Sequence, residues 1–148
     1  MRLAAALEGV ERVFLDTAPA IYFFERNPAY FGRMDAFPRI RRERNIVIVT
    51  SAITLAECLV HPIRNGLEEQ AAGFRRLILE SVGTEFHTMG SEAAELAARL
   101  RARMTLPLMD ALQVGCAIAT GCQVLLTNDR RLSRVDGVRI LVVDDLEH

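Results

Sequence analysis

The sequence predicts one α/β domain of 148 residues, a three-layer sandwich with a central, mainly parallel five-stranded sheet flanked by helices. Short β-rich runs alternate with helical stretches of ten or more residues, which is the pattern of parallel βαβ units. Four of the five expected strands are nearly continuous apolar runs, as in a sheet covered on both faces. The sequence shows no linker, repeat or low-complexity tract that would divide this series.

The expected strands are short, rich in β-branched residues and well separated. They lie over 12–17, 45–51, 85–89, 123–129 and 138–143, the third being the weakest. Residues 1–12 form an N-terminal extension before the first strand. The last three residues, 146–148, resemble the start of a C-terminal cloning tag and are left out of the functional reasoning.

The expected helices show apolar residues at helical spacing. They lie over 19–27, around the arginine-rich stretch 39–44, and over 52–63, 67–81, 92–104 and 106–121. Pro19 and Pro107 stand near the starts of two of these helices, and Gly121 follows the end of the last. Ser91, or Gly90 before it, is expected to cap the helix over 92–104.

Composition excludes several functional classes. The net charge is −1, so no global field draws the protein to nucleic acid or to an anionic membrane. All 18 basic residues are arginine, which excludes mechanisms that need a Schiff-base or P-loop lysine. Three cysteines, an odd number in apolar surroundings, predict free buried thiols in a reducing compartment. With no signal peptide or transmembrane run in the sequence, we expect a cytoplasmic protein that does not enter membranes.

Four carboxylates stand in otherwise apolar surroundings. Asp16 and Asp129 end expected strands, while Glu57 and Asp110 lie within expected helices. Three of them have a structural alternative, because an acid near a helix start can act as a cap. Glu57 is harder to explain in this way, since an unpaired buried carboxylate costs several kcal/mol.

The expected topology brings these four acids together. The carboxyl ends of parallel strands share one edge of the sheet, and the first turns of the following helices open onto it. Like charges about 4 Å apart repel by ~4 kcal/mol at an effective dielectric near 20, so the cluster should destabilise the fold unless it is protonated or a cation occupies it. An all-carboxylate site suits Mg²⁺ or Mn²⁺, which activate water for attack on a phosphodiester.

Three sequence blocks resemble the motif blocks of the PIN-domain nucleases, and most closely those of the VapC-type toxins. These blocks are "VFLDTAPAIYFFE", "VTSAITLAECLVHPIRNG" and "LPLMDALQVGCAIATGCQVLLTND". The resemblance spans about residues 13 to 143 as one PIN-like domain. One departure is Ala18, where many relatives carry a polar residue in "DTN" or "DTS".

The resemblance implies an Mg²⁺- or Mn²⁺-dependent ribonuclease. It assigns catalysis and metal binding to Asp16, Glu57, Asp110 and Asp129, and a supporting role to Thr127 and Asn128. It further implies an RNA substrate, a cognate antitoxin that fills the acidic cleft, and a homodimer. Arg130 and Arg131 adjoin Asp129 and are the best candidates for binding RNA phosphates.

Other functions stay open at this stage. A housekeeping PIN nuclease for RNA processing or decay would carry the same four acids. A non-catalytic RNA-binding module is a further alternative, although intact acids argue against it. A haloacid-dehalogenase-type phosphatase is disfavoured, because Ala18 stands where a second aspartate is needed, and a response-regulator receiver would need a lysine.

Overall fold

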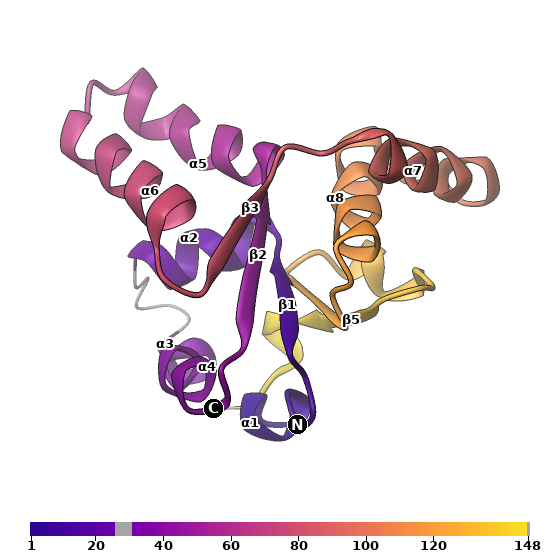
Figure 1. The fold of residues 1–148 in the computed structure, drawn as a ribbon, viewed down its shortest axis with the longest axis horizontal. Helices are drawn as coiled ribbons and strands as arrows, with labels where there is room; N and C mark the ends of the chain where they lie inside the picture. Colours follow the sequence, from indigo (N-terminus) through magenta and orange to yellow (C-terminus); the bar gives the residue numbers. More distant parts are fainter. Residues whose placement is uncertain (26–30, 148) are drawn as a thin grey trace.

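A computed structural model describes residues 1–25 and 31–147 of the chain (Figure 1). Its centre is a five-stranded sheet with the order β3-β2-β1-β4-β5, in which all neighbouring strands are parallel. The strands are β1 (Arg12–Leu15), β2 (Val47–Ser51), β3 (Thr84–His87), β4 (Val124–Thr127) and β5 (Arg139–Val142). The predicted α/β sandwich is confirmed, and each strand falls on a run from which it was predicted.

Successive residues of the central strand face two separate cores. Phe14 lies beside Val49 of β2 and Leu125 of β4, and all three pack in the core on the side of α7 and α8. Val13 and Leu15 point the other way, into the core beneath the helices of the N-terminal half. This alternation is why both faces of the sheet are apolar and why the strands appear in the sequence as continuous apolar runs.

Helices cover the two faces unequally (Figure 1). One face carries α2 (Thr17–Glu25), α4 (Phe37–Arg44), α5 (Ala52–Arg64) and α6 (Glu68–Glu80). The other face carries α7 (Ser91–Arg103) and α8 (Leu108–Ala119). The predicted helices are thus found with ends shifted by a few residues, and the last two residues of the helix predicted over 19–27 lie outside the described residues.

Short helical turns were not predicted, because segments of three to five residues are too short to show a periodic pattern. They are α1 (Leu3–Ala6), α3 (Phe31–Met34), η2 (Arg130–Arg134) and η3 (Val143–Asp145). Through α1, the N-terminal extension packs into the core, with Leu3 and Leu7 buried. Leu146, in the segment that resembles a tag, is also buried in this core, and Arg2 forms a parallel bridge with Glu147.

Helices α7 and α8 approach each other closely at Gly115. A β-carbon at this position would lie 2.4 Å from the backbone oxygen of Ala93 and 3.2 Å from the nitrogen of Ala97. Glycine therefore allows the two backbones to touch, and α8 carries one of the four acids on this tightly packed frame.

The three cysteines are free and buried, as predicted. Burial raises the pKa of the Cys58 thiol to about 12, so this thiol stays protonated and unreactive at neutral pH. Within the described part of the chain, every helix is too short or too polar to cross a membrane.

Candidate active site

All four predicted acids lie at the edge of the sheet where the strands end. Asp16 directly follows β1, and Asp129 comes two residues after β4. Asp110 is the third residue of α8, in its first turn. Glu57 is the sixth residue of α5, so it lies in the second turn and not in the first turn as predicted.

The prediction that Glu57 is embedded in apolar surroundings is wrong, because this residue is exposed. An ionised carboxylate without a cationic partner keeps its hydration when water reaches it, and burial would cost several kcal/mol. Its carboxylate accepts a hydrogen bond of 3.0 Å from the hydroxyl of Thr17, the first residue of α2. This bond ties Glu57 to the segment that follows Asp16.

Asp16 is held by hydrogen bonds at both carboxylate oxygens. The Thr127 hydroxyl donates to Oδ2 at 2.7 Å, and the Gln113 side-chain amide donates to Oδ1 at 3.3 Å. Thr127 is fully buried, and its Oγ1 also accepts a hydrogen bond of 3.1 Å from the backbone nitrogen of Asp129. One hydroxyl thus links the first and the last acid.

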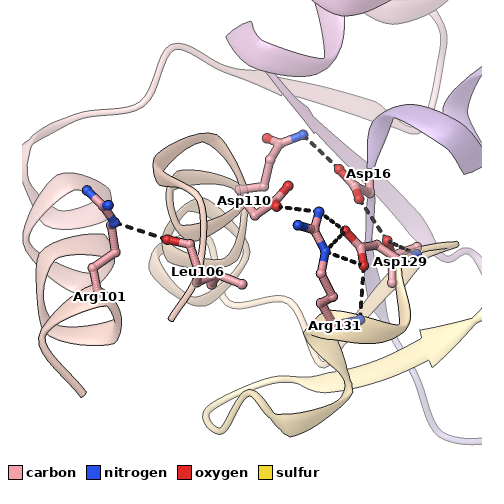
Figure 2. A network of polar contacts seen from close by, with 8 residues as sticks. Asp16, Arg101, Leu106, Asp110, Asp129 and Arg131 are labelled. Atoms are coloured by element: carbon pink, nitrogen blue, oxygen red, sulfur yellow. Dashed lines mark hydrogen bonds and ion pairs between the residues drawn. The ribbon is translucent and has the colours of Figure 1, made fainter. Parts of the chain in front are cut away.

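Arg131 lies between Asp110 and Asp129 (Figure 2). Its guanidinium Nη2 is 3.2 Å from Asp110 Oδ2 and 2.5 Å from Asp129 Oδ2, and its Nε donates to both oxygens of Asp129. Asp129 Oδ1 also accepts from the backbone nitrogen of Arg131, which makes Asp129 the N-cap of η2. The capping alternative therefore holds for Asp129 in addition to its place in the cluster.

The two carboxylates that share Arg131 differ in their proton affinity. Burial raises the pKa of Asp110, and the negative charge of Asp16 raises it further, against the opposing effect of Arg131. Hydrogen bonds from the Arg131 side chain instead lower the pKa of Asp129. Burial, and after it the charge of Asp16, therefore disfavours the charged form of Asp110, whereas Arg131 favours the charged form of Asp129.

A shallow pocket of about 550 Å³ opens beside Asp16 and Asp129. Its lining comes from the ends of β1 and β4 and from the start of α2 and η2: Asp16, Ala18, Tyr22, Thr127, Asn128, Asp129, Arg130 and Arg131. The missing polar side chain at position 18 leaves part of this wall apolar.

The other predicted residues contact parts of the fold around the acids. Asn128 accepts a hydrogen bond of 3.0 Å from the backbone nitrogen of Asp144, and its amide lies 3.5 Å from the hydroxyl of Tyr22. Arg130 forms an ion pair with Asp145. The Arg130 and Arg131 side chains are both more than half exposed, so each remains accessible from the pocket side.

A family model described as "PIN domain" matches residues 13–138. The chain belongs to the PIN-domain family. The match covers the segments that carry all four acids, from β1 to the residues after η2. No curated protein matches the sequence.

Several solved structures have a fold similar to that of this chain. VapBC2 of Rickettsia felis, bound to a promoter DNA fragment, has a TM-score of 0.67 at 19% identity and covers 88% of this chain and 98% of its own. A toxin–antitoxin complex of Klebsiella pneumoniae has a TM-score of 0.65 at 20% identity, with coverage of 88% and 97%. VapC20 of Mycobacterium tuberculosis, a sarcin–ricin loop cleaving toxin, has a TM-score of 0.57 at 17% identity, with coverage of 76% and 86%. At these identities the likeness shows a shared fold.

Sequence reasoning missed the buried polar residues of this PIN domain that support its acids. Gln113 of α8 is 1% exposed and contacts Asp16, Ser51 and Thr54. A glutamine inside the apolar run "ALQVGCAIA", one helical turn after Asp110, was the signal that could have revealed it. Thr17, whose hydroxyl donates a hydrogen bond to Glu57, was also absent from the predicted site residues.

The donor set fits a hard divalent ion, since it consists of carboxylate oxygens, one of them on an acid whose charged form is disfavoured. The spacing is wider than a bound ion requires. Over residues 1–25 and 31–147, no three Asp, Glu, His or Cys side chains are close enough together to hold a metal ion. In this arrangement the positive charge shared by two of the acids is the guanidinium of Arg131.

Proposed function

We propose that this PIN-domain protein is a metal-dependent endoribonuclease, the toxin of a VapBC-type toxin–antitoxin pair. The observation that carries the proposal is the meeting of Asp16, Asp110 and Asp129 at one edge of the sheet, linked through Thr127 and Arg131. Burial and the nearby charge of Asp16 raise the pKa of Asp110, and carboxyl groups with shifted pKa values are common in functional sites.

Asp16, Glu57, Asp110 and Asp129 would hold Mg²⁺ or Mn²⁺. When bound, such an ion lowers the pKa of a coordinated water and neutralises charge on the phosphodiester. The protein's own part is to position these acids. Thr127 fixes the Asp16 carboxylate, Thr17 orients Glu57, and Asn128 supports the loop that carries Asp129 by binding the backbone of Asp144.

The substrate side of the proposal rests on the exposed arginines of the pocket. Arg130 and Arg131 line it beside Asp129, so the RNA phosphates would contact these arginines close to the carboxylates of Asp16 and Asp129. The partners are an antitoxin and a second copy of the chain. Support for an antitoxin comes from the shared fold with two-component toxin–antitoxin complexes.

Purified protein should cleave single-stranded or looped RNA in Mg²⁺ or Mn²⁺, stop on addition of EDTA, and leave 5′-phosphate ends. Asp110→Asn protein, which keeps the shape of the side chain, is the matched inactive control. Products that end in a 2′,3′-cyclic phosphate would show attack by the substrate's own hydroxyl and would overturn the mechanism. RNA that is bound but never cut would indicate a binding module instead.

A further inference from the structure

Gln113 occupies the centre of a buried polar cluster at the carboxyl edge of the sheet. Its side chain, 1% exposed, lies among three elements: the end of β1, the end of β2, and the start of α5. Nε2 is 2.9 Å from Thr54 Oγ1 and 3.3 Å from Asp16 Oδ1, while Oε1 accepts a hydrogen bond from the Ser51 hydroxyl.

The direction of every hydrogen bond in this cluster is determined. Thr54 Oγ1 donates to the backbone oxygen of Leu15 at 3.3 Å, so it can only accept from Gln113. An ionised carboxylate is also only an acceptor, so the amide nitrogen must face Asp16. The amide oxygen then accepts from the Ser51 hydroxyl. Both N–H groups and the oxygen of the Gln113 amide therefore have a hydrogen-bond partner.

This arrangement determines how Asp16 presents its oxygens. Thr127 holds Oδ2 from the β4 side, and Gln113 holds Oδ1 from the α8 side, so rotation of the carboxylate would break one bond or the other. Gln113 also lies one turn after Asp110 on α8, so the same side chain sets the distance between the first acid and the third.

We infer that Gln113 is a positioning residue for the metal site: it acts through Asp16, fixing its carboxylate and the position of α8, and its amide is needed for tight binding of the divalent ion. The inference rests on the proposed function. A buried apolar side chain of similar length, as in Gln113→Met, would fill the same space without holding Asp16 Oδ1.

The decisive measurement is a Mn²⁺ titration, by calorimetry, of the full-length protein and of Gln113→Met. Removing a group that orients a metal ligand weakens metal affinity by about 10- to 100-fold. We therefore expect the Kd for Mn²⁺ to rise at least ~10-fold, and RNA cleavage by the variant to recover as the Mn²⁺ concentration is raised. A merely structural role would lower the melting temperature but leave the Kd of the folded protein unchanged.

Thr50→Val is the matched control. Thr50 is the neighbour of Ser51 on β2, is equally buried, and carries the one buried side-chain polar atom without a hydrogen-bond partner in the described part of the chain. Its change to valine should leave the Mn²⁺ Kd at the wild-type value. If Gln113→Met does not fold, Gln113→Leu also removes the amide and tests the same point, while Ser51 stays in place as the N-cap of α5.

The outcomes distinguish the role of Gln113 from the proposed nuclease activity. An equal Kd for wild type and Gln113→Met overturns the role of Gln113 and leaves the nuclease proposal standing. A wild-type protein that binds no Mn²⁺ overturns both. Weakened binding in Thr50→Val to the same degree would show a general effect of disturbing β2, and this result also overturns the inference.

Discussion

The contact between α7 and α8 at Gly115 predicts a sharp difference between two identical substitutions. In Gly115→Ala, the new methyl group would meet the Ala93 carbonyl oxygen at 2.4 Å, whereas ordinary van der Waals contact lies at 3.4–4 Å. The two helices must therefore separate by about 1 Å. Such overpacking costs ~1–3 kcal/mol, and it is only partly offset by the ~1 kcal/mol by which alanine exceeds glycine in helix propensity.

Gly73→Ala is the matched control, because Gly73 lies in the middle of α6 and a β-carbon there would meet nothing within 4 Å. It should gain the helix propensity without the clash, about 0.5–1 kcal/mol. In a domain of this size 1 kcal/mol corresponds to roughly 2–4 °C. Gly115→Ala should therefore melt several degrees below wild type, and Gly73→Ala slightly above it.

Thermal and urea unfolding followed by circular dichroism measure both variants directly. Helix α8 carries Asp110 and Gln113, and Gly115→Ala displaces this helix. The Gly115→Ala protein should therefore also bind Mn²⁺ more weakly than the Gly73→Ala protein, when each is tested well below its melting temperature. A Gly115→Ala protein as stable as Gly73→Ala would refute the close packing on which this reasoning depends.

Four further predictions concern the charges of the site. Asp110→Asn should stabilise the metal-free protein at pH 7, because the raised pKa of Asp110 means that folding disfavours its charged form. This penalty is absent below the ordinary pKa of 3.8 and develops as the pH rises above it. Asp129→Asn should destabilise the protein, because the lowered pKa of Asp129 contributes stability above pH 3.8 that is lost as the pH falls through the lowered value. Urea titrations at several pH values measure the free energy of unfolding of both variants. A change of the same sign in both would contradict these two predictions. Saturating Mn²⁺, at a hundredfold excess over Kd, should stabilise wild type by about 2.7 kcal/mol and Asp110→Asn by less, as read from melting temperatures with and without EDTA. Arg131→Gln should bind Mn²⁺ more tightly than wild type in calorimetry, because the guanidinium that competes for Asp110 and Asp129 is gone; weaker binding would show that Arg131 holds the acids in place for the ion.

The fold was predictable because the three inner strands, β1, β2 and β4, are buried on both faces. Phe14 and Leu125 pack in one core while Val13 packs in the other, so these inner strands appear in the sequence as apolar runs. The position of the acids followed from the same source, since parallel strands bring Asp16 and Asp129 to one edge whatever the details of packing.

What the sequence could not predict depends on the directions of side chains. Asp110 and Asp129 look equivalent in the sequence, and both were expected to destabilise the metal-free fold. The short helix η2 turns Arg131 back onto Asp129, and this contact lowers the pKa of Asp129 while the pKa of Asp110 is raised. In the same way, Glu57 follows an apolar pattern on α5 but lies where the helix reaches past the sheet, so it meets water and Thr17.

The hydrogen bonds that build the site join the two ends of the sequence. Asp16 lies 97 positions from Gln113 and 111 from Thr127, the two side chains that orient its carboxylate. During synthesis on a ribosome, β1, β2 and β3 emerge long before β4, which must then enter the sheet beside β1. A nascent chain that stops short of residue 127 contains the first three acids but has neither Thr127 nor Asp129. For the proposed nuclease, which would be made among RNA molecules, this order of assembly delays completion of the site until residue 129 has been translated.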